Sequence, residues 1–423
     1  MGKTSSKGAH RNSAPGRRSR ANGGDGSDSH GGRPVWTRGR GTVIGMSAAT
    51  ATATSLLLAA CTSASPLPSP SAASAGPSSA RPTPTTSATP APVSLPVKPT
   101  GEPVAVASGL DVPWSILRLP AGGTLISLRD DARIVELLAD GSQRLVTEVT
   151  AAVPSGEGGL LGLAFLPDTA AVGGLGWIYA YLTATSDNRI ERMPLLGQQG
   201  SYAVGGSESV LTGIPKAGNH DGGRIAFGPD GLLYATAGDA GNTDNAQDLG
   251  SLGGKILRMT PSGAVPADNP FGTLVYSYGH RNSQGIAWDS TGQLWASEFG
   301  QNTWDELNKI VPGGNYGWPI VEGISEDPAF VNPVHEWPTS EASPSGIAIV
   351  GDTIFMASLR GERLWRIEPS TGVVDDWFVN SFGRLRDVVS GPDATLWFVS
   401  NNTDGRGTPT SGDDRLYQVE VAP

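Results

Sequence analysis

Cysteine is nearly absent from this sequence of 423 residues, which contains a single thiol at Cys61. No disulfide can form within the chain, and clusters of cysteine ligands for zinc or iron are excluded. Histidine is also scarce: three of the five histidines follow residue 100, and His220, His280 and His335 lack metal-ligand spacing. The composition therefore excludes a cysteine nucleophile and a zinc or iron centre beyond the N-terminal hundred residues.

Long apolar runs and positive charge are missing as well. Residues 42–60 form an uncharged, largely apolar stretch, and no second run of about 18 apolar residues follows, so no transmembrane helix is expected. Acidic residues outnumber basic ones by 40 to 30, and nine of the basic but only two of the acidic residues lie in positions 1–60. The remainder carries a formal charge of −17. This charge argues against a nucleic-acid partner, because such binding needs positive patches.

The first 60 residues have the pattern of a bacterial export signal. Residues 1–41 are basic, residues 42–60 are small and apolar, and Leu58-Ala-Ala-Cys61 resembles a lipobox, the cleavage and lipidation motif of lipoproteins. We expect cleavage before Cys61 and a lipid on its thiol. The protein would then be extracytoplasmic, and either anchored to the membrane by this lipid alone or secreted. The alternative is that Cys61 is an ordinary cysteine in an apolar run.

Residues 61–102 consist almost wholly of Ser, Ala, Pro and Thr. Such a composition cannot bury a hydrophobic core, and it predicts a disordered, partly extended linker. The folded domain is therefore expected to comprise residues 103–423.

A unit of strand, tight turn and strand repeats through residues 103–423. Each copy places apolar, β-prone residues on both sides of a turn rich in Gly, Pro, Asp or Ser. Six copies at intervals of roughly 40–60 residues, without segments of helical period, predict an all-β, six-bladed β-propeller. The turn positions are Pro120, Pro167, Pro229, Ser290, Gly351 and Pro392.

The last strand-like segment, residues 415–421, has no hairpin after it. We expect it to pair within a blade that also contains strands from the start of the domain, near Val104. This pairing would close the ring non-covalently and remove exposed strand edges. Because loops from every blade converge at one end of a propeller's channel, the site residues should be scattered along the chain.

A histidine and a carboxylate flank one of the hairpins. Residues 224–236 are expected to form strand, turn and strand, with His220 just before them and Asp239 just after. The two ends of a hairpin lie on the same side of its sheet, so the two side chains come within reach of each other, as in an oriented general base. The alternative is a surface-loop histidine and an aspartate that caps a turn.

Eight short motifs follow one another along residues 104–421. Together they resemble the soluble pyrroloquinoline-quinone (PQQ)-dependent aldose sugar dehydrogenases of the glucose/sorbosone dehydrogenase family. The resemblance implies an oxidoreductase that converts aldose sugars at the anomeric carbon to lactones and passes the electrons to an external acceptor. The motifs occupy residues 109–115, 156–162, 219–224, 279–285, 305–308, 313–319, 344–346 and 383–387.

The resemblance also implies roles for individual residues. His220 would take the proton from the anomeric hydroxyl, Asp239 would hold its imidazole, and Arg281 would complete the catalytic group. The quinone is a tricarboxylate and needs cations; Arg384 and Arg386, two apart in a strand, face the same side. The alternative is that each arginine pairs with a local Asp or Glu. The residues expected around the cofactor are Glu157, Asn219, Arg281, Asn282, Arg360, Arg384 and Arg386.

The resemblance further implies Ca²⁺, which would polarise the quinone carbonyl that receives the hydride. Its protein ligands would be mostly backbone carbonyls, at Gly300 and Gln301. A second, structural Ca²⁺ is expected at Glu306 and the carbonyl of Tyr316, since a hard cation prefers oxygen ligands. The alternative for Glu306 is an ordinary turn acid.

Three positions depart from the pattern of the glucose-oxidising members. Glu157 stands in place of Gln, Asn219 in place of Asp beside the base, and Phe299 in place of a polar side chain. A carboxylate that faces an anionic cofactor is unfavourable unless it is protonated or paired with Arg or Ca²⁺. These departures concern cofactor affinity and substrate preference rather than the fold.

Two other functions are compatible with the sequence. One is a non-catalytic propeller that binds carbohydrate or protein at the cell surface, for which His220 would be dispensable. The other is a Ca²⁺-dependent propeller hydrolase of lactones or esters, with Asn219, Asn282 and Glu157 as candidate ligands. The second function leaves the four arginines unexplained.

Overall fold

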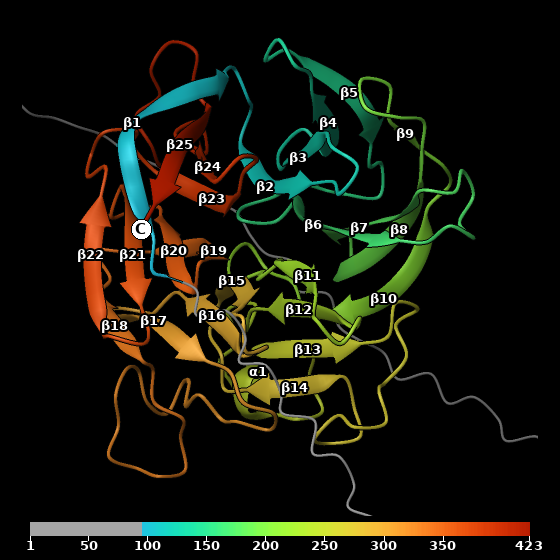
Figure 1. Cartoon of the computed structure of the whole chain (residues 1–423). Helices are drawn as coiled ribbons and strands as arrows, with labels where there is room; N and C mark the ends of the chain where they lie inside the picture. The colour runs from blue at the N-terminus through green and yellow to red at the C-terminus, as the bar shows by residue number, and fades with distance from the viewer. Residues whose placement is uncertain (1–94) are drawn as a thin grey trace, which may run out of the picture. The chain divides into compact units, whose positions relative to one another are not determined.

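The computed structural model describes residues 95–423, which form 25 β-strands and one four-residue helix, α1 (Asp244–Gln247). The predicted export signal, Cys61 and most of the predicted linker lie outside the described residues. The strands form six antiparallel sheets arranged as blades around a central channel (Figure 1). The predicted all-β, six-bladed β-propeller is confirmed. Within the part of the chain that the structure describes, no helix has the length and apolar character needed to span a membrane.

Each blade is a sheet whose strands run in order from the channel outward. We number the blades by the position of their innermost strand in the chain. Blade 1 contains β2 (Pro113–Arg118), β3 (Thr124–Leu128), β4 (Arg133–Leu137) and β5 (Gln143–Glu148). Blade 2 contains β6 (Leu160–Pro167), β7 (Gly176–Thr183), β8 (Asn188–Leu196) and β10 (Glu208–Ile214), with the short β9 (Ala203–Val204) paired to β8. Blade 3 contains β11 (Ile225–Phe227), β12 (Leu233–Ala237), β13 (Lys255–Met259) and β14 (Val275–Tyr278).

The other three blades follow the same plan. Blade 4 contains β15 (Ser283–Trp288), β16 (Leu294–Glu298), β17 (Trp304–Lys309) and β18 (His335–Pro338). Blade 5 contains β19 (Pro344–Val350), β20 (Thr353–Ser358), β21 (Arg363–Glu368) and β22 (Val373–Trp377). Blade 6 contains β23 (Leu385–Ser390), β24 (Thr395–Ser400), β25 (Leu416–Ala422) and β1 (Lys98–Ala107).

The six predicted hairpins form the first two strands of the six blades. In the β11–β12 hairpin, for example, Ile225 pairs with Ala235 and Phe227 with Leu233 across the Gly-Pro-Asp-Gly turn. The innermost strands, β2, β6, β11, β15, β19 and β23, contact their neighbours around the ring (Figure 1). The residues that begin these strands are thereby gathered at one end of the channel.

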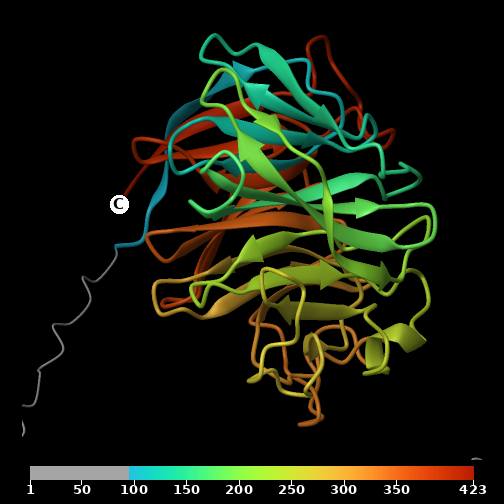
Figure 2. The same ribbon diagram turned by 90° about the vertical axis from the view of Figure 1, so that its right-hand side faces the viewer.

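The ring closes non-covalently in blade 6, as the sequence predicted. Strand β25 lies between β24 and β1, and its register with β1 pairs Val104 with Gln418 and Lys98 with Ala422. In a side view the C-terminus lies beside the start of β1 (Figure 2). Strand β1 begins at Lys98, so residues 98–102, which composition had assigned to the linker, belong to this strand, and residues 98–100 pair with β25.

The hydrophobic core is divided into six clusters, each between two adjacent blades. Strand β7 shows how one strand contributes to two clusters. Ile178 and Ala180 face blade 1, whereas Tyr179 and Tyr181 face blade 3, because alternate side chains of a strand point to opposite faces. All four are fully buried, and burying the larger ones contributes about 1.5–3 kcal/mol each. Packing between blades therefore holds the ring together.

The innermost strands approach so closely that some positions leave no room for a side chain. A Cβ on Gly346 of β19 would lie 2.0 Å from Oδ1 of Asp387 in β23. The carboxylate of Asp387 accepts hydrogen bonds from the amide of Ile116 at 2.8 Å and from Nη1 of Arg224 at 3.1 Å. The Arg224 guanidinium in turn lies 4.4 Å above the ring of Trp114. A buried ion pair thus joins blades 1, 3 and 6 across the channel.

Candidate functional site

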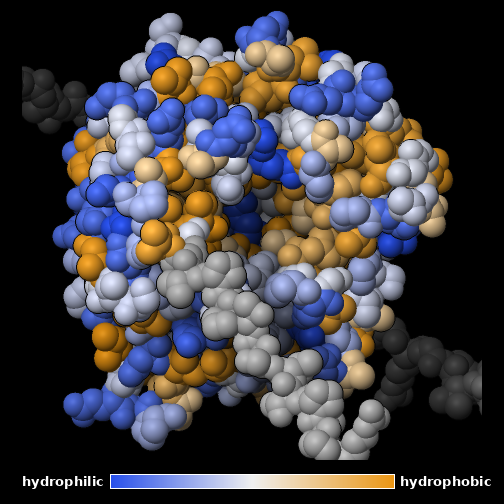
Figure 3. Space-filling model, in the orientation of Figure 1, coloured by the Kyte–Doolittle hydropathy of each residue, from blue (hydrophilic) through white to orange (hydrophobic). Residues whose placement is uncertain are grey.

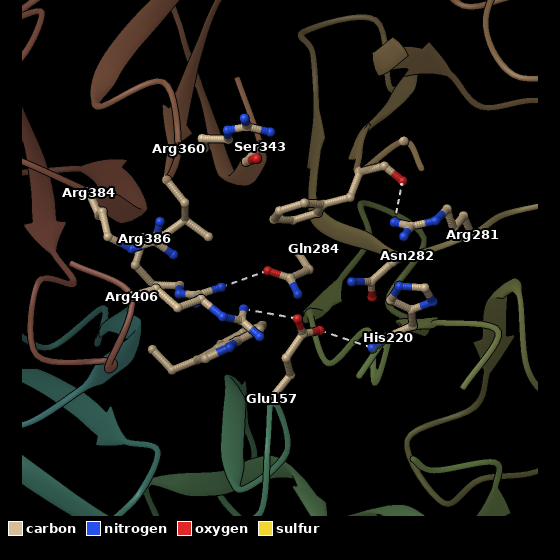
Figure 4. A pocket seen from close by; sticks show the side chains of 14 residues that line it. Glu157, His220, Arg281, Asn282, Gln284, Ser343, Arg360, Arg384, Arg386 and Arg406 are labelled. Atoms are coloured by element: carbon tan, nitrogen blue, oxygen red, sulfur yellow. Dashed lines mark hydrogen bonds and ion pairs between the residues drawn. The ribbon is translucent and has the colours of Figure 1, made fainter. Parts of the chain in front are cut away.

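A polar cavity of about 260 Å³ lies where the innermost strands begin. Arg384, Arg386 and Arg406 lie on one side of it and His220, Arg281 and Asn282 on the other (Figure 4). Figure 3 shows the opposite end of the ring, where Val97 lies beside the turn between β19 and β20, and a hollow is visible at its centre. The cavity wall carries five arginines and one carboxylate, that of Glu157. A site of this charge suits an anionic ligand.

His220 and Asp239 are in contact, as the hairpin geometry predicted. Nδ1 of His220 lies 2.7 Å from Oδ1 of Asp239, and Asp239 is fully buried. The other carboxylate oxygen accepts a hydrogen bond from the indole of Trp318 at 2.8 Å. Burial by itself raises the pKa of Asp239, but the hydrogen bonds from His220 and Trp318 outweigh it and lower the pKa below the usual aspartate value. Asp239 is therefore an ionised partner that orients the imidazole.

The backbone around His220 is held in an unusual conformation. His220 has a φ of 59°, in the left-handed region that side chains other than glycine rarely adopt. Gly238 allows the hairpin ends to meet, because a Cβ there would lie 2.0 Å from the carbonyl oxygen of His220. The amide of His220 donates to Oε2 of Glu157 at 2.9 Å. The surrounding loops thus fix the direction of the imidazole.

Arg384 and Arg386 both face the cavity, but their partners differ. Arg384 forms an ion pair with Asp404 at 2.9 Å. Arg386 contacts no carboxylate among the described residues; its Nη1 donates to Gln284 at 2.7 Å. Burial and the neighbouring cations Arg129 and Arg384 lower the pKa of Arg386 to about 9. The lowered pKa means that its surroundings disfavour the charged guanidinium, and a bound anion would stabilise that charge.

We call the side of the cavity formed by Arg384 and Arg386 the arginine wall, and it contains two buried nitrogens without a hydrogen-bond partner in the described residues. Within residues 95–423, neither Nε of Arg384 nor Nε of Arg386 makes a hydrogen bond. A buried donor without a partner costs free energy that an acceptor on a ligand would recover. The predicted cofactor, a tricarboxylate, fits this arrangement.

Of the remaining predicted residues on the wall, Arg281 and Asn282 lie across from this pair, whereas Arg360 lies on the same side as the pair (Figure 4). Arg281 is held by Oε1 of Gln301 at 3.0 Å and lies 5.5 Å from the ring of Trp318. Arg360 is exposed at the mouth and makes no ion pair with any acid in the described region. Asn282 is buried, and its Oδ1 accepts the amide of Gly222 at 3.0 Å.

Arg406 was missed by the sequence analysis. It lies in the loop between β24 and β25, lines the cavity and forms an ion pair of 3.0 Å with Oε1 of Glu157. Burial raises the pKa of Glu157, but the bond from the His220 amide and the charge of Arg406 lower it overall. Glu157 is therefore ionised and paired with an arginine. The sequence offers no local pattern that indicates Arg406, since the two partners are 249 positions apart.

Several predicted residues do not line the main cavity. Asn219 is exposed in the loop before His220. Gln301 is also exposed, and its Oε1 accepts a hydrogen bond from Nε of Arg281. Glu306 and Tyr316 lie beside a second, much smaller cavity of about 10 Å³, which Gly300 also lines. The structure thus separates the predicted metal residues from the arginine wall, with Gly300 shared between them.

The small cavity is bordered by the carboxylates of Glu298, Glu306 and Glu322. Burial and repulsion from Glu298 raise the pKa of Glu306 to about 8. A cation would relieve this repulsion, so the donor set fits a hard ion such as Ca²⁺. In residues 95–423, no three His, Cys, Asp or Glu side chains converge closely enough to hold a metal ion by themselves.

Fold and site together define a six-bladed propeller with a strongly cationic cavity beside an oriented histidine. The chain belongs to the glucose/sorbosone dehydrogenase family: the sequence profile described as "Glucose / Sorbosone dehydrogenase" matches residues 110–409. The family predicted from the motifs is confirmed, and the protein is an oxidoreductase.

Solved structures and curated sequences agree with this assignment. The PQQ-bound form of aldose sugar dehydrogenase from Streptomyces coelicolor is 50% identical, covering 77% of this chain and 98% of its own, with a TM-score of 0.72. Aldose sugar dehydrogenase YliI of Escherichia coli K12 is 30% identical over 332 residues, which are 70% of this chain and 89% of that protein. Quinoprotein glucose dehydrogenase B of Acinetobacter calcoaceticus is 31% identical over 261 residues, 53% of this chain and 54% of that protein.

Proposed function

We propose that this protein is a PQQ-dependent enzyme that oxidises aldose sugars at the anomeric carbon to lactones and passes the electrons to an external acceptor. The observation that carries the proposal is that His220, held by Asp239 behind it, lies in the wall of a cavity lined by five arginines. The family and the PQQ-bound relative from Streptomyces coelicolor support it.

The arginine wall would hold the cofactor. Arg384 and Arg386 offer the two buried Nε donors that make no hydrogen bond within residues 95–423, and Asp404 and Gln284 hold the two side chains in place. Arg281 and Asn282 from the opposite side of the cavity, and Arg360 from the neighbouring blade 5, would complete the set. When bound, the quinone supplies a two-electron acceptor in the cavity.

His220 acts as the general base in this proposal. The ionised Asp239 accepts a hydrogen bond from the Nδ1–H of His220. The neutral imidazole then carries no proton on Nε2, which is the nitrogen available to a substrate. Nε2 takes the proton of the anomeric hydroxyl while the hydrogen on the anomeric carbon leaves with its electron pair, and the lactone carbonyl forms. The carboxylate of Asp239 stabilises the imidazolium that results.

Ca²⁺ is proposed at two places. One ion would be held near the cavity by carbonyls of Gly300 and Gln301, where it would polarise the acceptor. The other would be held by Glu306 and the carbonyl of Tyr316, beside the cluster of glutamates. The raised pKa of Glu306, caused by its burial and by the charge of Glu298, supports the second site, because a cation would stabilise the ionised form of Glu306.

We also propose an extracytoplasmic location. Residues 1–60 would direct export, the thiol of Cys61 would carry a lipid, and a linker would separate the lipid from the propeller. A Cys61→Ser variant should leave the membrane fraction and appear in the soluble fraction. A variant that stays in the membrane fraction would exclude the lipid anchor.

Reconstitution tests the catalytic proposal. Full-length protein is incubated with Ca²⁺ and PQQ, and reduction of a dye is followed with a panel of aldoses. We expect saturable, sugar-dependent reduction in the wild type, none in His220→Ala, and a loss of kcat of about 100-fold or more in Asp239→Asn. Both variants should keep the quinone affinity of the wild type. Turnover in His220→Ala would remove the base assignment, and a wild type that binds no quinone would favour a non-catalytic propeller.

A further inference from the structure

Glu157 is shared between two partners on opposite sides of the cavity. Its Oε2 accepts the amide of His220 at 2.9 Å, and its Oε1 accepts Nη1 of Arg406 at 3.0 Å (Figure 4). Its own amide donates to the carbonyl of Gly218 at 3.1 Å. One carboxylate therefore joins the loop of the proposed base to a loop of blade 6.

The position of Arg406 is fixed by a buried carboxylate. Oδ1 of Asp404 accepts the backbone amide of Arg406 at 2.9 Å, while Oδ2 accepts Nη2 of Arg384 at 2.9 Å and the side-chain Nδ2 of Asn401 at 3.0 Å. The Asp404 side chain is only 1% exposed. The loop after β24 is thus folded against the arginine wall, and it presents Arg406 to Glu157.

The charge balance of the cavity depends on this contact. Glu157 is the only acidic side chain among the described residues that line the cavity, and a bare carboxylate there would repel an anionic ligand. Arg406 is the only lining arginine within ion-pair distance of it in residues 95–423. With Arg406 in place, the negative charge of Glu157 is balanced by the guanidinium, and the carboxylate accepts the hydrogen bond from the His220 amide.

We infer that Arg406 is a positioning residue that acts through Glu157: it serves as the counter-ion that lets an anionic cofactor occupy a cavity containing a carboxylate. The inference rests on the proposed function, in which that cofactor is PQQ. It predicts that Arg406 matters only while residue 157 is acidic. It also explains how this chain tolerates Glu157 where the glucose-oxidising members carry Gln.

A double-mutant cycle tests this dependence. The dissociation constants of PQQ and of benzene-1,3,5-tricarboxylate, a rigid probe of the same charge, are measured calorimetrically on the full-length protein. We expect Arg406→Ala to raise the dissociation constants of both ligands by about tenfold. The effect is limited to this size because the Arg406 side chain is 56% exposed and solvent screens its charge. In the Glu157→Gln background, Arg406→Ala should change the affinity for either ligand by less than about threefold. With Glu157 present, Arg406→Lys should retain most of the wild-type affinity.

A matched control separates this effect from a general loss of surface charge. Arg133 forms an exposed ion pair with Glu148 and does not line the cavity, so Arg133→Ala should leave both affinities unchanged. An equal loss in both backgrounds, or no loss in either, overturns the inference. If only the tricarboxylate probe binds and shows the coupling, the role of Arg406 stands and the proposed function fails. If the wild type binds neither ligand, both are overturned.

Discussion

Asp239 and Asp404 stand behind the cavity wall and hold the side chains that face it. Asp239 contacts His220 and Trp318, and Asp404 contacts Arg384 and the amide of Arg406. Neither aspartate lines the cavity. At the scale of residues, the site therefore consists of cations and a base that face inward, supported by carboxylates placed behind them.

The stability of the protein in acid should depend on Asp404. Burial raises the pKa of Asp404, but the charges of Arg384 and Arg386 outweigh it and lower the pKa below its usual value. A lowered pKa in the folded state means that the stabilisation is complete above the unfolded value, about 3.9, and is lost as the pH falls through the lower folded value. We expect Asp404→Asn to lower the free energy of unfolding by about 3 kcal/mol at pH 7, because the substitution removes the carboxylate that pairs with Arg384.

Urea denaturation of the wild type and Asp404→Asn at several pH values checks this expectation. The difference in the free energy of unfolding between the wild type and the variant should be constant above about pH 5 and should shrink below about pH 4. A difference that grows toward low pH would contradict the sign of the pKa shift. Asp393→Asn, an exposed turn residue, serves as a control and should change stability by less than about 0.5 kcal/mol.

At the scale of elements, the repeated hairpin determines where the site lies. The first strand of each hairpin borders the channel, so the residues just before it reach the same end of the ring. His220 precedes β11, Arg281 precedes β15 and Arg384 precedes β23. The close approach of these strands also limits which residues they contain.

Gly346 should be intolerant of any side chain. A Cβ there would overlap Oδ1 of Asp387, whose carboxylate is buried and bound to Arg224 and the amide of Ile116. We expect Gly346→Ala to destabilise the protein by about 3 kcal/mol, because the ion pair across the channel must move. Gly206 has open space around its Cβ position, so Gly206→Ala should stay within about 0.5 kcal/mol. Equal melting temperatures for the two variants would show that β19 and β23 can separate without cost.

At the scale of the whole molecule, the ring depends on a single non-covalent closure. Strand β25 is an interior strand of blade 6, and Leu416, Val419 and Val421 are buried in the clusters on its two faces. Strand β1 is the outermost strand, and only two of its ten residues are buried. The two ends of the domain therefore contribute unequally to its stability.

Truncation separates these contributions. Deletion of residues 416–423 should prevent folding, because it opens two clusters and leaves the edges of β24 and β1 unpaired. Deletion of residues 1–102 should give a folded protein with a lower melting temperature, since it removes only half of an edge strand. Soluble yield and circular dichroism melts distinguish the two. A folded protein without β25 would mean that closure is dispensable.

The sequence by itself determined the elements and one contact of the site. The spacing of the six turns predicted the blades, and the orphan strand at residues 415–421 predicted the closure with the region of Val104; both are confirmed. The hairpin at residues 224–236 predicted the contact of His220 with Asp239, because both residues lie at the same end of one local unit. Such features depend on alternation and turn chemistry over a few residues, which the sequence records directly.

Only the tertiary structure decided which residues face one another across the ring. Arg224 and Asp387 are 163 positions apart, and Glu157 and Arg406 are 249 apart. Their contacts depend on the number of blades, on the distance between opposite innermost strands and on the path of the loop after β24. No local pattern carries this information, because it arises when the last strand pairs with the first and the ring acquires its diameter.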